Sequence, residues 1–257
     1  MFDPNSPFTR TFGEQIGGNL SPQQRMDINL NTELTDQIDM LNRRIEVMCG
    51  QVLVESKLTI VGELYPEVQL DFQRDPDLTV NLSGAAEWGD AGISPLDDLD
   101  TWSQLVFAKS GVRPRKVVMT LDAYKLFRNS AAVVKIFDRL RANNTLQDTA
   151  VEGDDGWYAG NIGGYDISVY AGSYIDPISN TSKDILPPYT VILGGQGIQG
   201  YRAFGAIRDE KAGWQAMPYF PKSWTEEDPA VRYIMLQSAP IVCPLYPDAS
   251  LAATVKQ

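Results

Sequence analysis

YAGNIGGYDISVYAGSYID (residues 158–176) is the stretch of sequence that most constrains the fold. Its apolar and polar residues alternate, its glycines punctuate it, and the segments LPPYTVILGG (186–195), YRAFGAIRDE (201–210) and YFPKSWTEEDPAVRYIMLQSAP (219–240) continue the pattern. Alternation bounded by Gly and Pro is typical of short strands joined by tight turns. None of these segments supplies a set of catalytic residues. We therefore predict that the C-terminal third consists mainly of short strands and that it functions through the surfaces it presents rather than through catalysis.

The composition is that of a globular protein with an acidic surface. The chain has 257 residues, of which 43% are hydrophobic, and its net charge is −11. Nucleic-acid affinity rests on Lys and Arg that neutralise phosphates, so this surface disfavours such binding. Histidine is absent, which excludes Ser-His-Asp and Cys-His catalysis and His-ligated zinc. We predict no catalytic residue, no cofactor site and no metal site.

Neither a membrane segment nor a disulfide is expected. No apolar run approaches the ~20 residues that a membrane span needs, and the first residues, MFDPNSP, do not resemble a signal peptide. The two cysteines, Cys49 and Cys243, lie in a predicted helix and a predicted strand. We interpret both as small buried hydrophobic residues rather than as partners in a disulfide.

A long helix is predicted between about residues 32 and 54, after an irregular segment at 1–31. Asn31 or Thr32 could cap it. Apolar residues then recur at alternating spacings of four and three, the pattern of one helical face: Leu34, Ile38, Leu41, Ile45, Met48 and Val52. This face predicts an amphipathic helix that packs on a sheet.

Two apolar, alternating segments follow, at 68–72 and 78–82, and Arg74-Asp75-Pro76-Asp77 lies between them. Because this tetrapeptide has good turn chemistry, we predict that the two segments pair as a long ribbon. A further strand-like segment, Leu58–Val61, precedes them.

Helices and strands then alternate irregularly. Ser94 and Pro95 predict the start of a helix and Gly111 its end. Lys116–Thr120 is a predicted buried strand, and Leu121–Asn129 and Ala131–Arg141 are two predicted short helices. Because this order lacks a regular alternation of strand and helix, we assign the chain to the α+β class.

Three motifs each admit two interpretations. Gly195–Gly200 matches G-x-G-x-x-G, but the following residues alternate like a strand, so a glycine turn is favoured over a nucleotide site. Arg113, Arg115 and Lys116 form either a solvated strand edge or a phosphate site. The loop that contains Glu152, Asp154 and Asp155 is either an acidic turn or a calcium loop, and it lacks the EF-hand spacing.

Carboxylates and tryptophans also leave alternatives open. Asp97, Asp98 and Asp100 are explained by the charge preference of a helix N-terminus, although a carboxylate pair for glycoside hydrolysis requires only suitable geometry. The five tryptophans (Trp88, Trp102, Trp157, Trp214 and Trp224) are either core residues or anchors at subunit contacts.

A series of blocks in order gives the chain a specific resemblance. These are the long helix, AEWGDAGISPLDDLDTWSQ (86–104), VVMTLDAYKLFRNSAAVVKIFDRLR (117–141), and the segment from Trp157 to Val255, where the resemblance is closest. Together they resemble the bacteriophage lambda major capsid protein family (phage major capsid protein E). The resemblance implies the Hong Kong 97-like capsid fold, in which a peripheral domain with a spine helix and a β ribbon joins an axial domain with a central sheet flanked by helices.

The resemblance also implies a division of the chain. Residues 1–31 correspond to the last part of an N-terminal arm and extended loop, which are longer in the family, so we expect this chain to be a truncated, processed or internally started form. Residues 32–93 correspond to the peripheral domain, 94–239 to the axial domain, and 240–257 to a return into the peripheral domain. Because the arm and loop link neighbouring subunits in this fold, we expect their shortness to affect whether this chain assembles.

The function implied is that of a major capsid protein without enzymatic activity. Copies would assemble into pentamers and hexamers of an icosahedral shell that encloses DNA without sequence-specific binding. Decoration, scaffold and portal proteins are further implied partners. The implied location is the virion, after synthesis in the bacterial cytoplasm. A nanocompartment shell of the same fold, a carboxylate-dependent hydrolase and a monomeric binding module are the alternatives.

Charged and aromatic residues are our candidates for contacts between subunits. We expect Arg43 and Arg44 of the long helix to form ion pairs with neighbouring subunits. Trp88, Trp224 and Arg232 complete the set of candidate subunit-contact residues.

Overall fold

A computed structural model describes residues 20–62, 65–90, 92–142, 152–153, 155–176, 179–195, 197–227 and 231–257. The chain forms two compact units. Unit 1 comprises residues 1–45 and 202–241, and unit 2 comprises residues 46–201 and 242–257. This division differs from the expected domains, because 202–239 groups with the first part of the long helix and 242–257 groups with the central sheet.

The helices are α1 (Pro22–Glu55), α2 (Pro95–Ser110), α3 (Leu121–Asn129) and α4 (Ala131–Ala142). Within the described ranges, none of them is both long enough and apolar enough to cross a membrane. The boundaries of α2, α3 and the strand after α2 confirm the predictions. Ser94 precedes α2, Pro95 begins it, and Gly111 ends it in the left-handed conformation at φ 71°.

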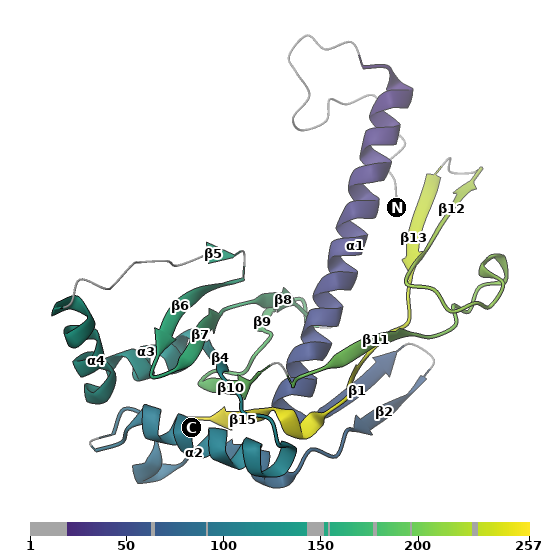
Figure 1. Cartoon of the computed structure of the whole chain (residues 1–257). Helices are drawn as coiled ribbons and strands as arrows, with labels where there is room; N and C mark the ends of the chain where they lie inside the picture. Colours follow the sequence, from purple (N-terminus) through teal and green to yellow (C-terminus); the bar gives the residue numbers. More distant parts are fainter. Residues whose placement is uncertain are drawn as a thin grey trace. The chain divides into compact units, whose positions relative to one another are not determined.

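Unit 2 is built on a seven-stranded mixed sheet in the order β3-β15-β10-β4-β7-β6-β5 (Figure 1). Its strands are β3 (Thr79–Asn81), β4 (Lys116–Thr120), β5 (Glu152–Gly153), β6 (Gly156–Ile162), β7 (Tyr165–Tyr170), β10 (Thr190–Gly194) and β15 (Leu251–Thr254). β4 and β7 run parallel, as do β15 and β3, and the other described pairs are antiparallel.

The remaining strands form two-stranded sheets. They are β1 (Lys57–Gly62) with β2 (Tyr65–Asp71), β8 (Ser173–Ile175) with β9 (Ser182–Asp184), β11 (Gly200–Phe204) with β14 (Pro240–Pro244), and β12 (Phe220–Glu226) with β13 (Val231–Gln237). Together with the interleaved helices, they confirm the α+β class.

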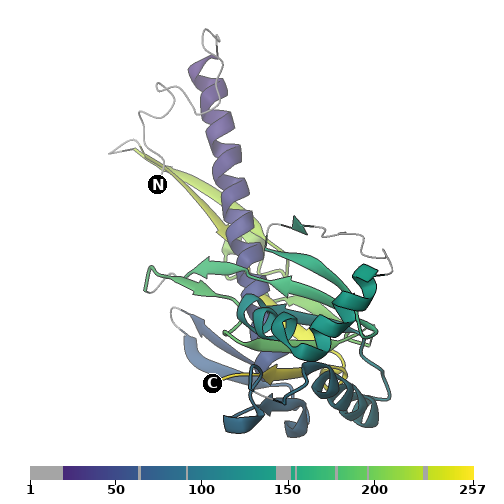
Figure 2. The same cartoon turned by 90° about the vertical axis from the view of Figure 1, so that its left-hand side faces the viewer.

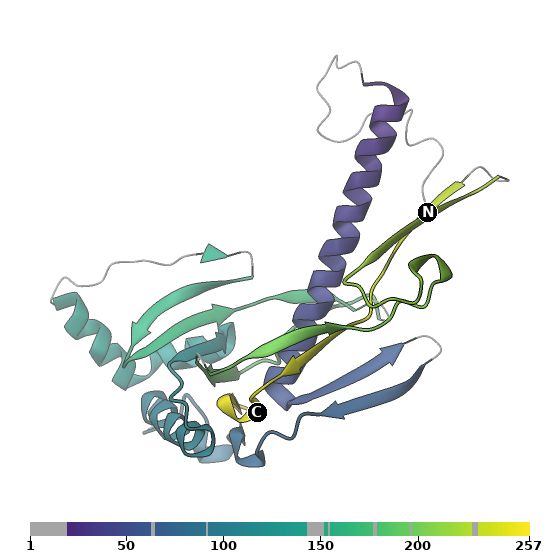
Figure 3. The ribbon, with the colours of Figure 1, turned by 45° about the vertical axis from the view of Figure 1, so that its right-hand side comes forward.

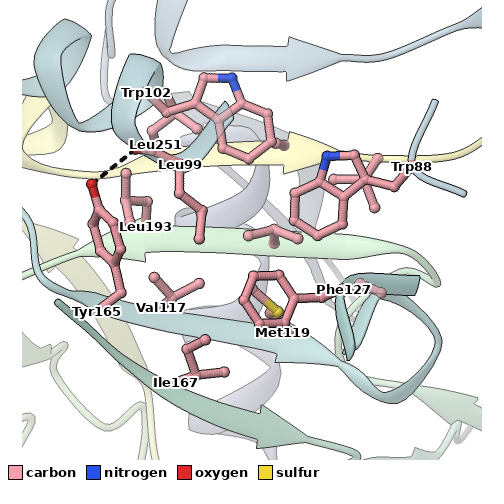
Figure 4. Packing of buried hydrophobic residues seen from close by; sticks show 14 of the residues in the cluster. Trp88, Leu99, Trp102, Val117, Met119, Phe127, Tyr165, Ile167, Leu193 and Leu251 are labelled. Carbon is pink, nitrogen blue, oxygen red and sulfur yellow. Dashed lines mark hydrogen bonds between the residues drawn. The ribbon is translucent and has the colours of Figure 1, made fainter. Parts of the chain in front are cut away.

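The core of unit 2 lies between the sheet and the helices that cover it (Figure 2). Leu99 and Trp102 of α2 and Phe127 of α3 meet Val117, Met119, Ile167, Leu193 and Leu251 of the sheet (Figure 4). Tyr165 reaches across to α2, where its hydroxyl donates to the carbonyl of Leu99 at 3.3 Å and to Asp100 at 2.8 Å. A large buried aromatic cluster therefore fixes α2 and α3 on the sheet.

α1 begins ten residues before the predicted start. Ser21 and Gln24 form a reciprocal capping box: the Ser21 amide donates to Gln24 Oε1 at 2.9 Å, and the Gln24 amide donates to Ser21 Oγ at 3.3 Å. Pro22 occupies the first helical position, where its missing N–H is not needed. The prediction that residues 22–31 are irregular is therefore wrong, and residues 1–19 lie outside the described residues.

The predicted ribbon between 68–72 and 78–82 is also wrong. β2 pairs instead with β1, Leu58 facing Leu70 and Ile60 facing Val68, whereas β3 joins the seven-stranded sheet beside β15. Arg74 separates the two. Its guanidinium donates to the carbonyls of Leu53 and Val54 at 2.6 Å each, which ties the chain to the end of α1 instead of allowing a hairpin turn.

Candidate subunit-contact surface

The β12–β13 hairpin is a paired element of unit 1 (Figure 3). Its seven residue pairs run from Phe220–Gln237 to Glu226–Val231 without a bulge, and most residues of β12 are exposed. Isolated two-stranded hairpins are marginal in water. This hairpin therefore depends on cross-strand pairs and on its anchor to the rest of unit 1.

Trp224 and Tyr233 form an aromatic cross-strand pair. They face each other in the register, and their rings stack with centroids 5.2 Å apart and planes 13° apart. Trp224 remains 38% exposed. The Tyr233 hydroxyl faces Glu226 across the hairpin at 3.4 Å, and the Glu226 charge raises the pKa of Tyr233. The stack therefore orders an aromatic surface that remains accessible.

An ion pair anchors the base of the hairpin. Lys222 of β12 pairs with Asp209, a buried carboxylate that also accepts from the Lys211 amide at 2.8 Å. The hydrogen bond from Lys222 and then that from the Lys211 amide lower the pKa of Asp209. Asp209 therefore stays ionised at neutral pH and holds the loop before β12 against the hairpin.

A groove runs between α1 and the hairpin within unit 1. Its first part has a volume of about 360 Å³ and includes Asp27, Leu34, Lys222 and Arg232. Its second part, of about 410 Å³, is lined by Gln37, Met40, Leu41, Ile234, Met235, Leu236 and Ser238. Among the residues lining these two parts, Asp27 is the single carboxylate, so neither offers the carboxylate pair of a glycoside hydrolase.

The sequence-predicted contact residues are spread over both units. Arg44 is exposed on α1, while Arg43 is half-buried and engaged in an interaction within the protein. Arg232 borders the groove and donates to Ser223 Oγ at 3.3 Å. Trp224 and Arg232 therefore share one hairpin, whereas Arg43 and Arg44 belong to the helix.

Trp88 is a core residue, which corrects the expectation that it contacts a neighbouring subunit. Its side chain is 1% exposed, and it stacks on Trp102 with centroids 5.9 Å apart. Its indole Nε1 donates to Asp98 Oδ2 at 2.8 Å. Burial raises the pKa of Asp98, while the indole hydrogen bond partly opposes this shift.

The remaining motifs take structural roles. The strand β11, not a helix, follows Gly195–Gly200, which favours the turn interpretation, and Gln196 lies outside the described residues. Asp98 and Asp100 accept from Trp88 and Tyr165. Arg113, Arg115 and Lys116 are exposed at the start of β4, and Asp154 of the acidic loop lies outside the described residues. Cys49 and Cys243 are half-buried, and neither is part of a disulfide.

Sequence reasoning missed the groove. Tyr233–Leu236 is a run of four aromatic or aliphatic residues on one strand. Such a run, unlike strict alternation, indicates that both faces of a strand meet apolar surroundings. This run was the signal in the sequence that β13 lies beside α1 in addition to carrying Tyr233 of the hairpin's aromatic stack.

Comparison with known proteins places this fold. Residues 2–255 match the family described as phage major capsid protein E. The chain belongs to this family. Both the family assignment and the capsid fold predicted from the sequence are thereby confirmed.

Curated members of the family are similar over most of this chain. The major capsid protein of Escherichia phage lambda is 32% identical over 209 residues, which cover 79% of this chain and 60% of the lambda protein. That of Enterobacteria phage phi80 is 31% identical over 218 residues, which cover 82% of this chain and 62% of the phi80 protein. The chain thus spans about three fifths of the length of these relatives.

A solved structure shares the fold. The crystal structure described as that of a prophage capsid protein from E. coli CFT073 matches with a TM-score of 0.80 at 22% identity, over 97% of this chain and 74% of that chain. At this identity, the likeness concerns the fold alone.

Proposed function

We propose that the chain is a structural subunit of the head of a tailed phage or prophage. Copies of it associate into pentamers and hexamers of an icosahedral shell that encloses DNA. The match to the capsid protein family over residues 2–255 carries this proposal. No enzymatic activity is part of it.

The mechanism is physical. A subunit contacts its neighbours through different surfaces on its two sides, and such heterologous contacts close into rings when the rotation between neighbours is fixed. Each contact is modest, but a subunit held by several neighbours dissociates far more slowly than one held by a single contact. The exposed hairpin of unit 1, with Trp224 and Arg232, supports the proposal as one such surface.

The charge balance suits a DNA container. With a net charge of −11, the chain repels phosphate overall, so packaged DNA would be enclosed rather than bound. Decoration, scaffold and portal proteins are proposed further partners. The proposed location is the virion, after synthesis in the bacterial cytoplasm.

Sedimentation velocity with negative-stain imaging of the fast fraction tests the proposal. We expect five- and six-fold rings or hollow particles. A second chain, extended at its N-terminus with the corresponding segment of the lambda relative, serves as the comparison. If both chains remain monomers, at 28.5 kDa for the shorter one, the proposal is overturned.

A further inference from the structure

The part of α1 in unit 1 presents an exposed acidic face. No Lys or Arg occurs between Arg25 and Arg43, a stretch that contains four carboxylates. Three of these, Glu33, Asp36 and Asp39, are exposed and lie at successive spacings of three, which makes them neighbours on the helix surface. None of the three forms an ion pair with another described residue. Because neighbouring like charges on a helix repel one another, cations from another molecule would stabilise this acidic face.

The start of β4 in unit 2 presents an exposed basic edge. Arg113, Arg115 and Lys116 are three exposed cations within four positions, and none of them forms an ion pair with a described carboxylate. Their backbone is fixed between two strands: the Arg115 amide donates to the Gly194 carbonyl at 3.0 Å, and the Asp166 amide donates to the Arg115 carbonyl at 2.8 Å. The basic edge therefore holds its charges in defined places.

The carboxylate beside the basic edge already has neutral partners. Lys116 faces Asp166 in the register of β4 and β7. The Asp166 carboxylate, however, accepts from Asn161 Nδ2 at 2.8 Å and from the Tyr158 hydroxyl at 3.2 Å. Its lone pairs are therefore engaged away from the cations, and the basic edge keeps its positive charge for another molecule.

The acidic face and the basic edge match in length. Glu33 and Asp39 are separated by about 9 Å along a helix that rises 1.5 Å per residue. Arg113 and Lys116 are separated by about 10 Å along an extended chain that rises about 3.3 Å per residue. Arg can also bind a carboxylate through two parallel hydrogen bonds. The carboxylates of one surface can therefore face the cations of the other simultaneously.

An apolar side chain accompanies each charged surface. Met40, which is 71% exposed, follows Asp36 by four positions and therefore lies beside it on α1. Ile198, which is 37% exposed, lies against Gly194, the residue whose carbonyl binds the Arg115 amide. Burial of these two side chains in a contact would add a hydrophobic contribution to the charge pairing.

We propose that the acidic face of α1 in one copy docks on the basic edge of β4 in a second copy. This inference rests on the proposed function, because it specifies one of the contacts between subunits. The two surfaces are different parts of the chain, and each copy carries both. The contact is therefore heterologous and can repeat from copy to copy.

Exchange of charge between copies tests the docking. Glu33→Lys with Asp36→Lys reverses the acidic face, and Arg113→Glu with Arg115→Glu reverses the basic edge. Either chain alone should associate at least about 10-fold more weakly than the parent, because like charges then meet at the contact. An equimolar mixture of the two chains should recover the association, because each reversed surface meets its opposite on the other chain. Sedimentation velocity measures both.

A matched control separates the contact from net charge. Arg202→Glu with Lys135→Glu makes the same change in net charge at two exposed cations outside the basic edge, and this chain should associate like the parent. Association of the parent should also weaken when NaCl is raised from about 0.05 to about 0.5 M, because salt screens exposed charges. Circular dichroism verifies that each variant is folded.

The outcomes separate this inference from the proposed function. Rings or particles that form equally well from either reversed chain overturn the docking and leave the shell function standing. Association that recovers in the mixture without rings or particles supports the docking and counts against the shell.

Two further outcomes would overturn the assignment to a second copy. If one chain with all four changes associates like the parent but the mixture does not, the two surfaces pair within a single chain. If association is lost on nuclease treatment and survives reversal of the acidic face, the basic edge contacts DNA instead.

Discussion

Two stacked aromatic pairs occupy opposite environments in this protein. Trp88 and Trp102 in unit 2 stack with centroids 5.9 Å and planes 15° apart, and Trp224 and Tyr233 in unit 1 stack at 5.2 Å and 13°. The geometry is nearly the same. Trp88 is 1% exposed, however, and Trp224 is 38% exposed.

Because their exposure differs, the two pairs have different roles. Around Trp88 the sheet, α2 and α3 exclude water, so removal of the ring leaves a cavity that the rest of the core cannot fill. Around Trp224 the hairpin has water on one side, and loss of the ring exposes little new apolar surface. Unit 2 thus holds the fold, and the hairpin of unit 1 offers a surface.

The largest effect is expected for Trp88→Ala. Large-to-small changes of buried aromatic residues cost about 3–5 kcal/mol, enough to unfold a marginally stable protein. Chemical denaturation followed by circular dichroism measures the loss. Trp88→Phe, which retains most of the ring, is the control and should lose clearly less. A loss for Trp88→Ala no greater than that for Trp224→Ala would remove the distinction between the two pairs.

Arg74→Ala should have the next largest effect. The Arg74 guanidinium bonds the Leu53 and Val54 carbonyls and Thr79 Oγ1, and hydrogen bonds to charged groups are worth about 1.5–3 kcal/mol. The measurement is the free energy of unfolding. Arg74→Lys keeps the charge but lacks the planar fork, so it should recover only part of the loss. Full recovery by Lys would show that charge, rather than the geometry at the end of α1, matters.

The Trp88–Asp98 hydrogen bond should respond in opposite ways to two changes. Asp98→Ala leaves the buried indole N–H without an acceptor and should cost about 1–2 kcal/mol. Asp98→Asn keeps an acceptor and removes a carboxylate whose pKa burial raises, so its stability at pH 7 should equal or exceed that of the parent. Thermal unfolding of the three proteins decides. A strongly destabilised Asp98→Asn would mean that the negative charge itself is required.

Trp224→Ala should change folding little and association more. Aromatic pairs add about 0.5–1.5 kcal/mol beyond their buried area, and this pair is half exposed, so we expect the lower end. Parallel melting and sedimentation experiments separate the two effects. Trp224→Phe keeps an aromatic ring that can stack on Tyr233, so this variant should assemble normally. An unchanged melting temperature together with normal particles would contradict the role of Trp224.

The smallest effect concerns pH. Because the ion pair with Lys222 lowers the pKa of folded Asp209, its contribution is complete above the unfolded value of about 3.9 and is lost as pH falls through the folded value. Asp209→Asn removes this contribution. The stability difference between parent and variant should therefore be constant from pH 7 to 5 and shrink on further acidification. A stability difference that grows as the pH falls below 5 would contradict this prediction.

Local signals predicted the local elements. Ser94, Pro95 and Gly111 marked both ends of α2 correctly, because caps act through neighbouring residues. The same type of signal was present at Ser21, Pro22 and Gln24, but the glycines and prolines before it favoured a loop. The start of α1 was therefore predictable in principle.

Pairing and burial could not be predicted in the same way. The alternation at 78–82 fits a ribbon with 68–72 as well as it fits a sheet edge, and β15, about 170 residues later in the chain, provides the partner of β3. Likewise, nothing adjacent to Trp88 in the sequence distinguishes it from Trp224. Trp88 is buried by contacts with α2, α3 and the sheet, whereas Trp224 is 38% exposed.

Hydrogen exchange measured on dispersed and on associated protein distinguishes the part of the molecule that holds the fold from the part that contacts other copies. We expect the amides of β4, β7, β10 and β15 to be strongly protected in both states. The amides of β12, β13 and the part of α1 in unit 1 should gain protection only on association. Protection gained in the central sheet while the hairpin and α1 stay unchanged would contradict the claim that unit 2 holds the fold and unit 1 provides the contacts.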